Sequence, residues 1–116
     1  MKILGLDVST SVVGWAITDE RGTLLDYGAW DLKNKNKYPD IFEKASFVGA
    51  ELAKMSVDRV YIEQNLFMFQ SGASSAKVLN QLSKFNGMVS MLCFYHLKIK
   101  PEYISSGTAR KLNNLK

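Results

Sequence analysis

The chain has 116 residues, a length that fits one domain. Hydrophobic residues make up 47% and charged residues 22% of the sequence, which excludes an intrinsically disordered chain. The net charge of +4 is compatible with a polyanionic partner, and the lone Cys93 excludes an internal disulfide framework, so together with the lack of a signal-peptide pattern we expect a cytoplasmic protein.

The first third of the chain predicts three strands in an antiparallel meander. Residues 2–8 are apolar or glycine apart from the first residue and Asp7, as expected of a strand covered on both faces. Residues 12–19 are rich in β-branched and aromatic side chains, and residues 23–31 return as the third strand. Gly22 lies in the tight connection between these two strands, where it can adopt a positive φ.

A polar loop and a helix follow the meander. Lys33, Lys35 and Lys37 alternate along the loop, and we expect them to form a solvated turn. Asp40 and Glu43 have the spacing of a capping box at the start of a helix. The expected buried face of that helix keeps helical spacing through Ile41, Ala45, Val48, Leu52 and Met55.

The second half of the chain predicts alternating strands and helices. Residues 58–63 form a strand that ends on Glu63, and a long helix is expected to begin near Ser74. Residues 99–104 predict a fifth strand, followed by the start of another helix. The apolar stripe of the long helix is expected to comprise Val78, Leu82, Phe85, Val89, Leu92 and His96, with His96 as an end-of-helix residue rather than a general base.

This order of elements predicts an α/β fold. The sheet is expected to be mixed and five-stranded, with three antiparallel strands followed by parallel strands, and with helices on its faces.

Two carboxylates stand out in this pattern. Asp7 interrupts the apolar first strand and Glu63 ends the apolar fourth strand. Taken alone, Asp7 is more simply explained as a solvent-facing residue or as an acceptor of backbone hydrogen bonds from the following turn. If the first and fourth strands are neighbours, however, the two carboxylates converge into an oxygen site suited to Mg²⁺ or Mn²⁺.

Four segments resemble the RuvC-like Holliday-junction resolvases of the ribonuclease H-like superfamily. MKILGLDVSTSVVGWAI is similar to their first strand and turn, and VYIEQNLFMF to the strand in which a catalytic Glu precedes an aromatic loop. SSAKVLNQLSKFNGMV and KPEYISSGTARKLNNL are similar to the next helix and to a later strand with its basic segment. The first motif is shared across the superfamily, but the order and spacing of the four matches are more specific.

The resemblance implies hydrolysis of phosphodiester bonds with two divalent metal ions about 3.5–4 Å apart. Asp7 and Glu63 would be the catalytic metal ligands, with Mg²⁺ or Mn²⁺ as the cofactor. The substrate would be a Holliday junction or other branched DNA. Because paired nicks across a junction need two sites related by a two-fold axis, a homodimer is also implied, and we expect its interface on the long helix, through Phe85, Met88, Met91 or Leu92.

Aromatic and basic residues complete the expected DNA-binding set. The resemblance implies that Phe67, and after it Phe69, inserts between bases, although such residues otherwise tend to fold into the core. Lys77 and Lys84 are expected near the same face as the carboxylates, where they would pair with phosphates. Arg110 and Lys111 match the basic segment of the resembled proteins and are expected to do the same.

The pattern departs from the resembled proteins at its end. These proteins complete the site with further acids on a C-terminal helix, whereas this sequence ends at Lys116. We therefore expect residues 1–116 to form a single nuclease domain that lacks its last helix. Since two carboxylates hold Mg²⁺ weakly, a non-catalytic module that binds branched DNA is the alternative.

Two further superfamily relatives share part of the pattern. RNA-guided nucleases have a similar first segment, but large insertions usually separate their first Asp from their Glu. Sugar kinases and actin share the first strand and its small polar turn, but they need a second, duplicated domain that 116 residues cannot supply.

Overall fold

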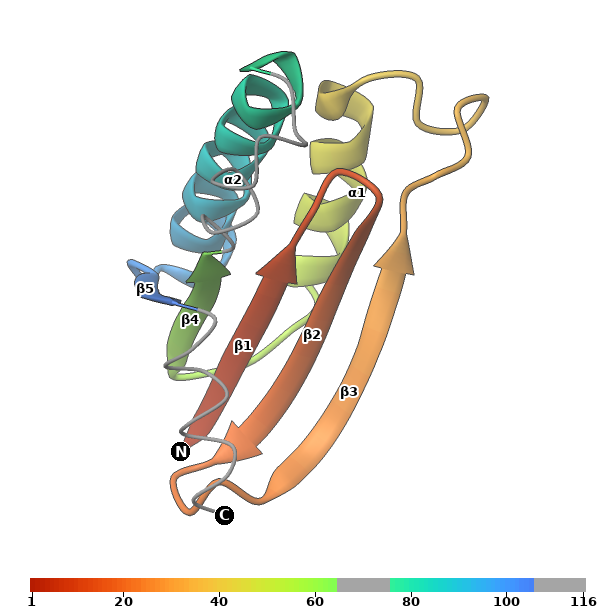
Figure 1. Ribbon diagram of the computed structural model, residues 1–116. Coiled ribbons are helices and arrows are strands. Elements are labelled where there is room, and N and C mark those ends of the chain that lie inside the picture. Colours follow the sequence, from red (N-terminus) through yellow and green to blue (C-terminus); the bar gives the residue numbers. More distant parts are fainter. Residues whose placement is uncertain (65–75, 106–116) are drawn as a thin grey trace.

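The computed structural model describes residues 1–64 and 76–105, which form a five-stranded sheet with the order β3-β2-β1-β4-β5 (Figure 1). β1, β2 and β3 pair antiparallel, whereas β4 pairs parallel with β1 and β5 pairs parallel with β4. The strands are β1 (Lys2–Val8), β2 (Val12–Asp19), β3 (Leu24–Asp31), β4 (Arg59–Gln64) and β5 (Glu102–Ser105), and the described helices are α1 (Ile41–Leu52) and α2 (Ala76–Leu97). The expected mixed α/β sheet is confirmed, with its bounds shifted by a few residues.

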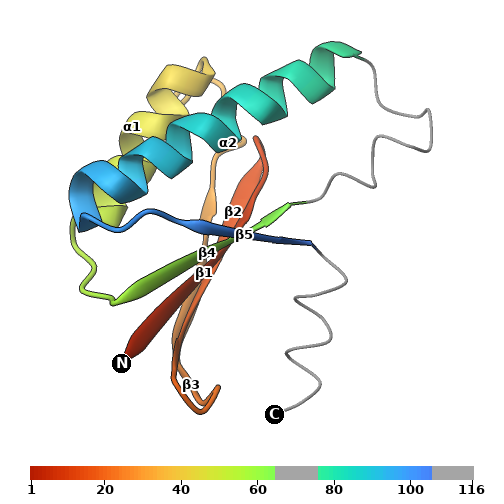
Figure 2. The same ribbon diagram turned by 90° about the vertical axis from the view of Figure 1, so that its left-hand side faces the viewer.

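Both described helices lie on one face of the sheet, which we call the covered face (Figure 2). Side chains alternate along a strand, so Leu4, Leu6 and Val8 of β1 point to this face and are almost fully buried. The same face carries Val60 and Ile62 of β4. The core therefore lies between the sheet and the two helices.

The opposite face, which we call the open face, is not covered by any element in the described part of the chain (Figure 2). Asp7 is exposed and Gly5 is half-buried on this face. The expectation that β1 is covered on both faces is therefore wrong for the described residues. The apolar run of β1 arises instead because the half-buried Ile3 and Gly5 occupy its other two open-face positions.

The local signals at the turns and at α1 are confirmed. Gly22 has a φ of 83° in the turn between β2 and β3. Asp40 is the N-cap of α1, and its side chain accepts a hydrogen bond of 2.9 Å from the backbone N–H of Glu43. The expected face is buried at Ala45, Val48 and Leu52, while Met55 packs against the core from beyond the end of the helix.

The apolar stripe expected along α2 is only partly correct. Phe85 and Val89 are fully buried, but Val78 is 54% exposed and His96 is also exposed. Cys93 takes the third buried position, because the row that faces the sheet advances by four residues at a time along the helix. The expected start of α2 near Ser74 lies outside the described residues.

The fifth strand begins later than the pattern predicts. Residues 99–104 were expected to form it, but β5 starts at Glu102, directly after Pro101, which has no backbone N–H to give to the ladder. Lys98, with a φ of 59°, makes the turn after α2. The helix expected after β5 lies outside the described residues. None of the helices within residues 1–64 and 76–105 is long and apolar enough to cross a membrane.

Candidate active site

The sheet register brings Asp7 and Glu63 side by side. They are direct partners in the parallel ladder between β1 and β4, and neighbouring strands lie about 4.8 Å apart. Partner residues in adjacent strands point to the same face, so both carboxylates lie on the open face, with Asp7 exposed and Glu63 half-buried. The convergence expected for neighbouring first and fourth strands is what this register produces, and we call the two residues the carboxylate pair.

The surroundings of the carboxylate pair are small or apolar. Gly14 is the partner of Asp7 on β2, and a Cβ added to it would lie 3.9 Å from the Cβ of Asp7. Ile104 is the partner of Glu63 on β5. The pair borders a depression of about 970 Å³ on the open face, whose lining includes Ile3, Gly5, Gly14, Ala16, Tyr61 and Ile104. Glycine and alanine keep the floor of this depression close to the backbone, which leaves room for a bulky ligand beside the carboxylates.

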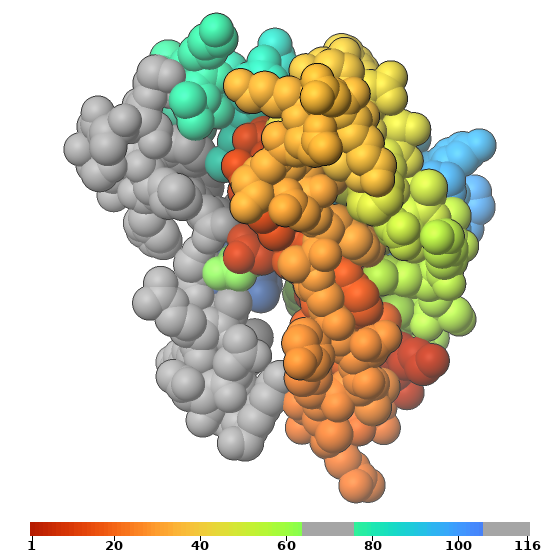
Figure 3. Space-filling model, turned by 90° about the vertical axis from the view of Figure 1, so that its right-hand side faces the viewer, coloured from red at the N-terminus to blue at the C-terminus, as the bar shows by residue number. Residues whose placement is uncertain are grey.

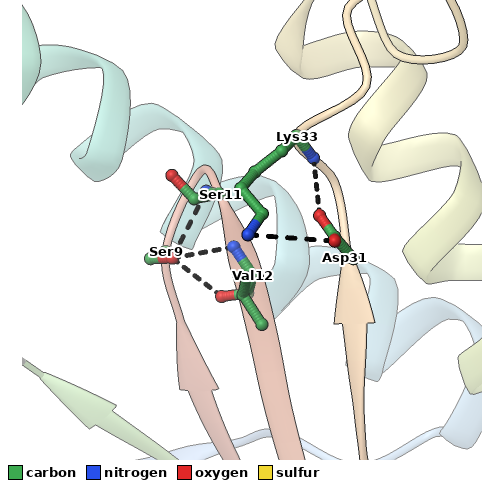
Figure 4. Close-up of polar contacts among 5 residues, drawn as sticks. All are labelled: Ser9, Ser11, Val12, Asp31 and Lys33. Atoms are coloured by element: carbon green, nitrogen blue, oxygen red, sulfur yellow. Dashed lines mark hydrogen bonds and ion pairs between the residues drawn. The ribbon is translucent and has the colours of Figure 1, made fainter.

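The turn that follows Asp7 is held by its own hydrogen bonds (Figure 4). The hydroxyl of Ser9 accepts from the backbone N–H groups of Ser11 and Val12, at 3.3 and 3.0 Å, and donates to the carbonyl of Val12 at 2.7 Å. The ammonium of Lys44, on α1, donates to the carbonyl of Thr10. These bonds order the turn that directly follows β1 and join it to α1.

The chemistry of the carboxylate pair is that of a hard oxygen site. Carboxylate oxygens are ligands that Mg²⁺ and Mn²⁺ prefer, so the donor set fits a divalent cation. Within residues 1–64 and 76–105, no group of three His, Cys, Asp or Glu side chains is close enough to hold a metal ion. The two carboxylates found among the described residues are fewer than the ligands that an octahedral site needs.

Of the other expected site residues, only Lys77 and Lys84 lie in the described part of the chain. Lys77 and Lys84 are exposed on α2, which packs on the covered face rather than on the open face of the carboxylates (Figure 2). Their expected contact with phosphates stays a prediction. Their position follows from the parallel β4–α2–β5 connection, which carries α2 across one face of the sheet. The expected site residues Phe67, Phe69, Arg110 and Lys111 lie outside the described residues.

Sequence reasoning did not single out Gly14 or Lys44 as parts of the site. Gly14 had a signal, because a glycine within a β-branched and aromatic strand often marks a close approach of another group. Lys44 had none, since its contact with Thr10 joins residues 34 positions apart.

The sequence matches no family model and no curated protein. Among solved structures, T. thermophilus RuvC in complex with a Holliday junction substrate superposes with a TM-score of 0.75 at 11% identity, covering 96% of this chain and 68% of that one. An Aquifex aeolicus Ppx/GppA family member gives a TM-score of 0.46 at 9% identity, covering 93% and 36%. LC11-RNase H1 in complex with an RNA/DNA hybrid gives 0.42 at 14% identity, covering 96% and 90%. The last two scores are too low to support an argument, but the first covers the whole arrangement of strands and helices described above. The chain therefore has the ribonuclease H-like fold, in the form seen in RuvC.

Proposed function

We propose that this chain is a nuclease domain that hydrolyses phosphodiester bonds in branched DNA, with the Holliday junction as its substrate. The observation that carries the proposal is the side-by-side placement of Asp7 and Glu63 on neighbouring parallel strands of a RuvC-type sheet. The substrate is proposed by likeness to the RuvC neighbour, whose structure contains a Holliday junction.

Asp7 and Glu63 would hold Mg²⁺ or Mn²⁺. When bound, the ion supplies a polarised water molecule and neutralises charge on the phosphate. The carboxylates would attract and orient the cation at the carboxyl ends of β1 and β4, on the open face. Because Gly14, the partner of Asp7 on β2, has no side chain on the open face, a DNA backbone can approach the carboxylate pair closely.

We also propose that the active species is a homodimer, because paired nicks require two sites related by a two-fold axis. The expected interface needs correction, since Phe85 is fully buried within the protomer and Met88 and Leu92 pack against its core. Of the expected residues only Met91 is largely exposed, at 60%. It lies near Phe94 and Tyr95 on α2, which are 42% and 59% exposed.

Met91→Lys is expected to shift the molar mass in light scattering from dimer to monomer, and a dimer that persists in this variant would rule out this face.

The test of cleavage is a nicking assay on a synthetic four-way junction with Mg²⁺ or Mn²⁺. Asp7→Asn and Glu63→Gln are each expected to reduce the nicking rate by more than the roughly 10–100-fold loss typical of changes to outer-shell residues. Asp26→Asn is the matched control, because it removes an exposed carboxylate from β3 of the same sheet. Nicking that survives Asp7→Asn unchanged would contradict the proposal.

A second function, binding of branched DNA without cleavage, is favoured by one observation. Within the described residues only two carboxylates converge, and no third ligand joins them. Junction binding without nicks in either metal, and without any effect of Asp7→Asn on the dissociation constant in the presence of metal, would establish this second function.

A further inference from the structure

The loop formed by residues 33–37 lies at the same end of the sheet as the carboxylate pair. β3 is antiparallel to β2, which is antiparallel to β1, so β3 runs in the same direction as β1 and β4. The chain therefore leaves β3 at the end where Asp7 and Glu63 stand. In Figure 3 the segment after β3 protrudes at this end of the molecule, in the upper part of the view. This position was not evident from the alternating lysines of the sequence.

The loop is anchored at both of its ends, to the turn that follows Asp7 and to α1. On one side, the backbone N–H of Leu32 donates to the carbonyl of Ser11 at 2.8 Å, which joins the loop to the turn that follows Asp7. On the other side, Tyr38 is buried and packs against Phe47 with a ring-centroid distance of 5.4 Å.

An internal turn orders the residues between these anchors. The side-chain oxygen of Asn34 accepts hydrogen bonds from the backbone N–H groups of Asn36 and Lys37, at 3.0 and 3.2 Å. The lysines are therefore presented from a loop whose backbone is already ordered, which lowers the entropic cost of binding a ligand.

The loop concentrates positive charge. Lys33, Lys35 and Lys37 are all exposed. Lys33 lies 3.9 Å from Asp31, beside the turn that follows Asp7, but both side chains are about two-thirds exposed, at 65% and 68% (Figure 4). Such a surface pair is weak and leaves the ammonium available to another anion. Lys37 lies over the ring of Tyr38, at 5.5 Å from its centroid, with its charge still facing solvent.

We propose that residues 33–37 form a phosphate-binding loop that holds the DNA backbone next to the carboxylate pair. The proposal rests on the function proposed above, which it extends by a binding surface. Asp7 and the last residues of β3 are separated by two strand spacings, about 10 Å. Phosphates of one duplex strand are about 3.4 Å apart along the axis, so the loop contacts phosphates a few nucleotides from the bond at the carboxylates. The lysines thus offset the repulsion between the carboxylate pair and the DNA backbone.

The test measures how binding of a four-way junction depends on salt, in wild-type protein and in two triple variants. Lys33→Gln/Lys35→Gln/Lys37→Gln removes the loop charges. Lys54→Gln/Lys98→Gln/Lys100→Gln is the matched control, because these exposed lysines follow α1 and α2 or precede β5, at the opposite end of the sheet. Both variants lose the same net charge, so any difference between them reports on position.

For the loop variant, the dissociation constant at about 0.1 M salt is expected to rise by at least about 10-fold. The negative slope of the logarithm of the association constant against log[salt] is expected to become shallower by about 2. The control is expected to stay within about twofold of wild type. Lys35→Glu alone is expected to weaken binding about fivefold or more, and it keeps the test decisive if the triple variant fails to fold.

Equal effects of the two triple variants, or no effect of either, would overturn the loop proposal while leaving junction binding and the proposed function intact. Wild-type protein that binds no junction at any salt concentration would overturn both proposals. A loop variant that binds DNA normally but loses binding to an acidic protein would assign the loop to a different partner and overturn the proposal as stated.

Discussion

The two faces of the sheet differ in what their side chains do. On the covered face, Leu6 of β1 and Ile62 of β4 are partners in the ladder, and each is at most 2% exposed. One residue further along the same strands, on the open face, the partners are Asp7 and Glu63. A shift of one position thus separates packing from chemistry, because successive side chains of a strand point to opposite faces. Substitutions on the covered face are therefore expected to lower stability, whereas substitutions of the carboxylates on the open face are expected to lower activity.

The largest effect on stability is expected for Leu6→Ala on the covered face. Leu6 is 2% exposed, and removing such a side chain costs about 2–5 kcal/mol through lost burial and the cavity left behind. Urea denaturation monitored by tryptophan fluorescence measures this loss. A change of less than about 1 kcal/mol would show that the helices do not seal this face.

A smaller loss of stability is expected for Gly28→Ala, at a position of β3 that lies on the covered face. A Cβ added to Gly28 would lie 2.7 Å from the ring of Trp15, which itself packs against Trp30 with a centroid distance of 6.0 Å. The ring must shift, at a cost of about 1–3 kcal/mol.

Gly5→Ala on the open face is the matched control for Gly28→Ala. The nearest atom to an added Cβ at Gly5 is the carbonyl oxygen of Ala16, at 3.9 Å. This variant is therefore expected to be as stable as wild type or slightly more stable. Equal destabilisation by the two substitutions in urea denaturation would contradict the difference between the faces.

Cys93 reports on the closure of the covered face. Burial raises the pKa of its thiol to about 12, so the folded protein holds a neutral thiol at pH 8, and modification by iodoacetamide is expected to be about 1000-fold slower than in the unfolded chain. Because the folded pKa lies above the unfolded one, this contribution to stability is complete below pH 8 and is lost as the pH rises toward 12. Urea denaturation at pH 7 and at pH 10 measures this effect. Between these two pH values, the free energy of unfolding is expected to fall less in Cys93→Ala than in wild type. Rapid modification of the native protein at pH 8 would show that the thiol is accessible.

A small effect on stability is expected for Asp7→Asn on the open face. Asp7 is exposed beside Glu63, and surface substitutions usually change stability by less than about 0.5 kcal/mol. The same variant is expected to lose nicking, so stability and activity separate at this position. A loss of stability as large as that of Leu6→Ala would mean that Asp7 has a structural role.

Much of the fold was predictable because its signals are local. The alternation of residues 2–8 and 12–19, the Asp40 cap and the Gly22 turn each depend on a few neighbouring residues, and each was found where the pattern indicated. The buried face of α2 was predicted less well, with Cys93 in place of His96. In a helix of 22 residues, more than one set of residues with helical spacing can form an apolar face, and only contact with the sheet selects the set that is buried.

The carboxylate pair was predictable only in part. The sequence marks Asp7 and Glu63 as acids in apolar strands, but not that β1 and β4 are neighbours in register. The loop of residues 33–37 shows the same limit, because only the direction of β3 places its lysines at the same end of the sheet as the carboxylates.

The elements, their order and the identity of the two acids follow from side-chain periodicity and turn chemistry within short windows of the sequence. The folded chain, in contrast, is needed to show which strands are neighbours, which face the helices cover and which charges lie at one end of the sheet. These features depend on pairing between residues far apart in the sequence, such as Asp7 with Glu63, whose contact is set by the burial of the whole core rather than by any local preference.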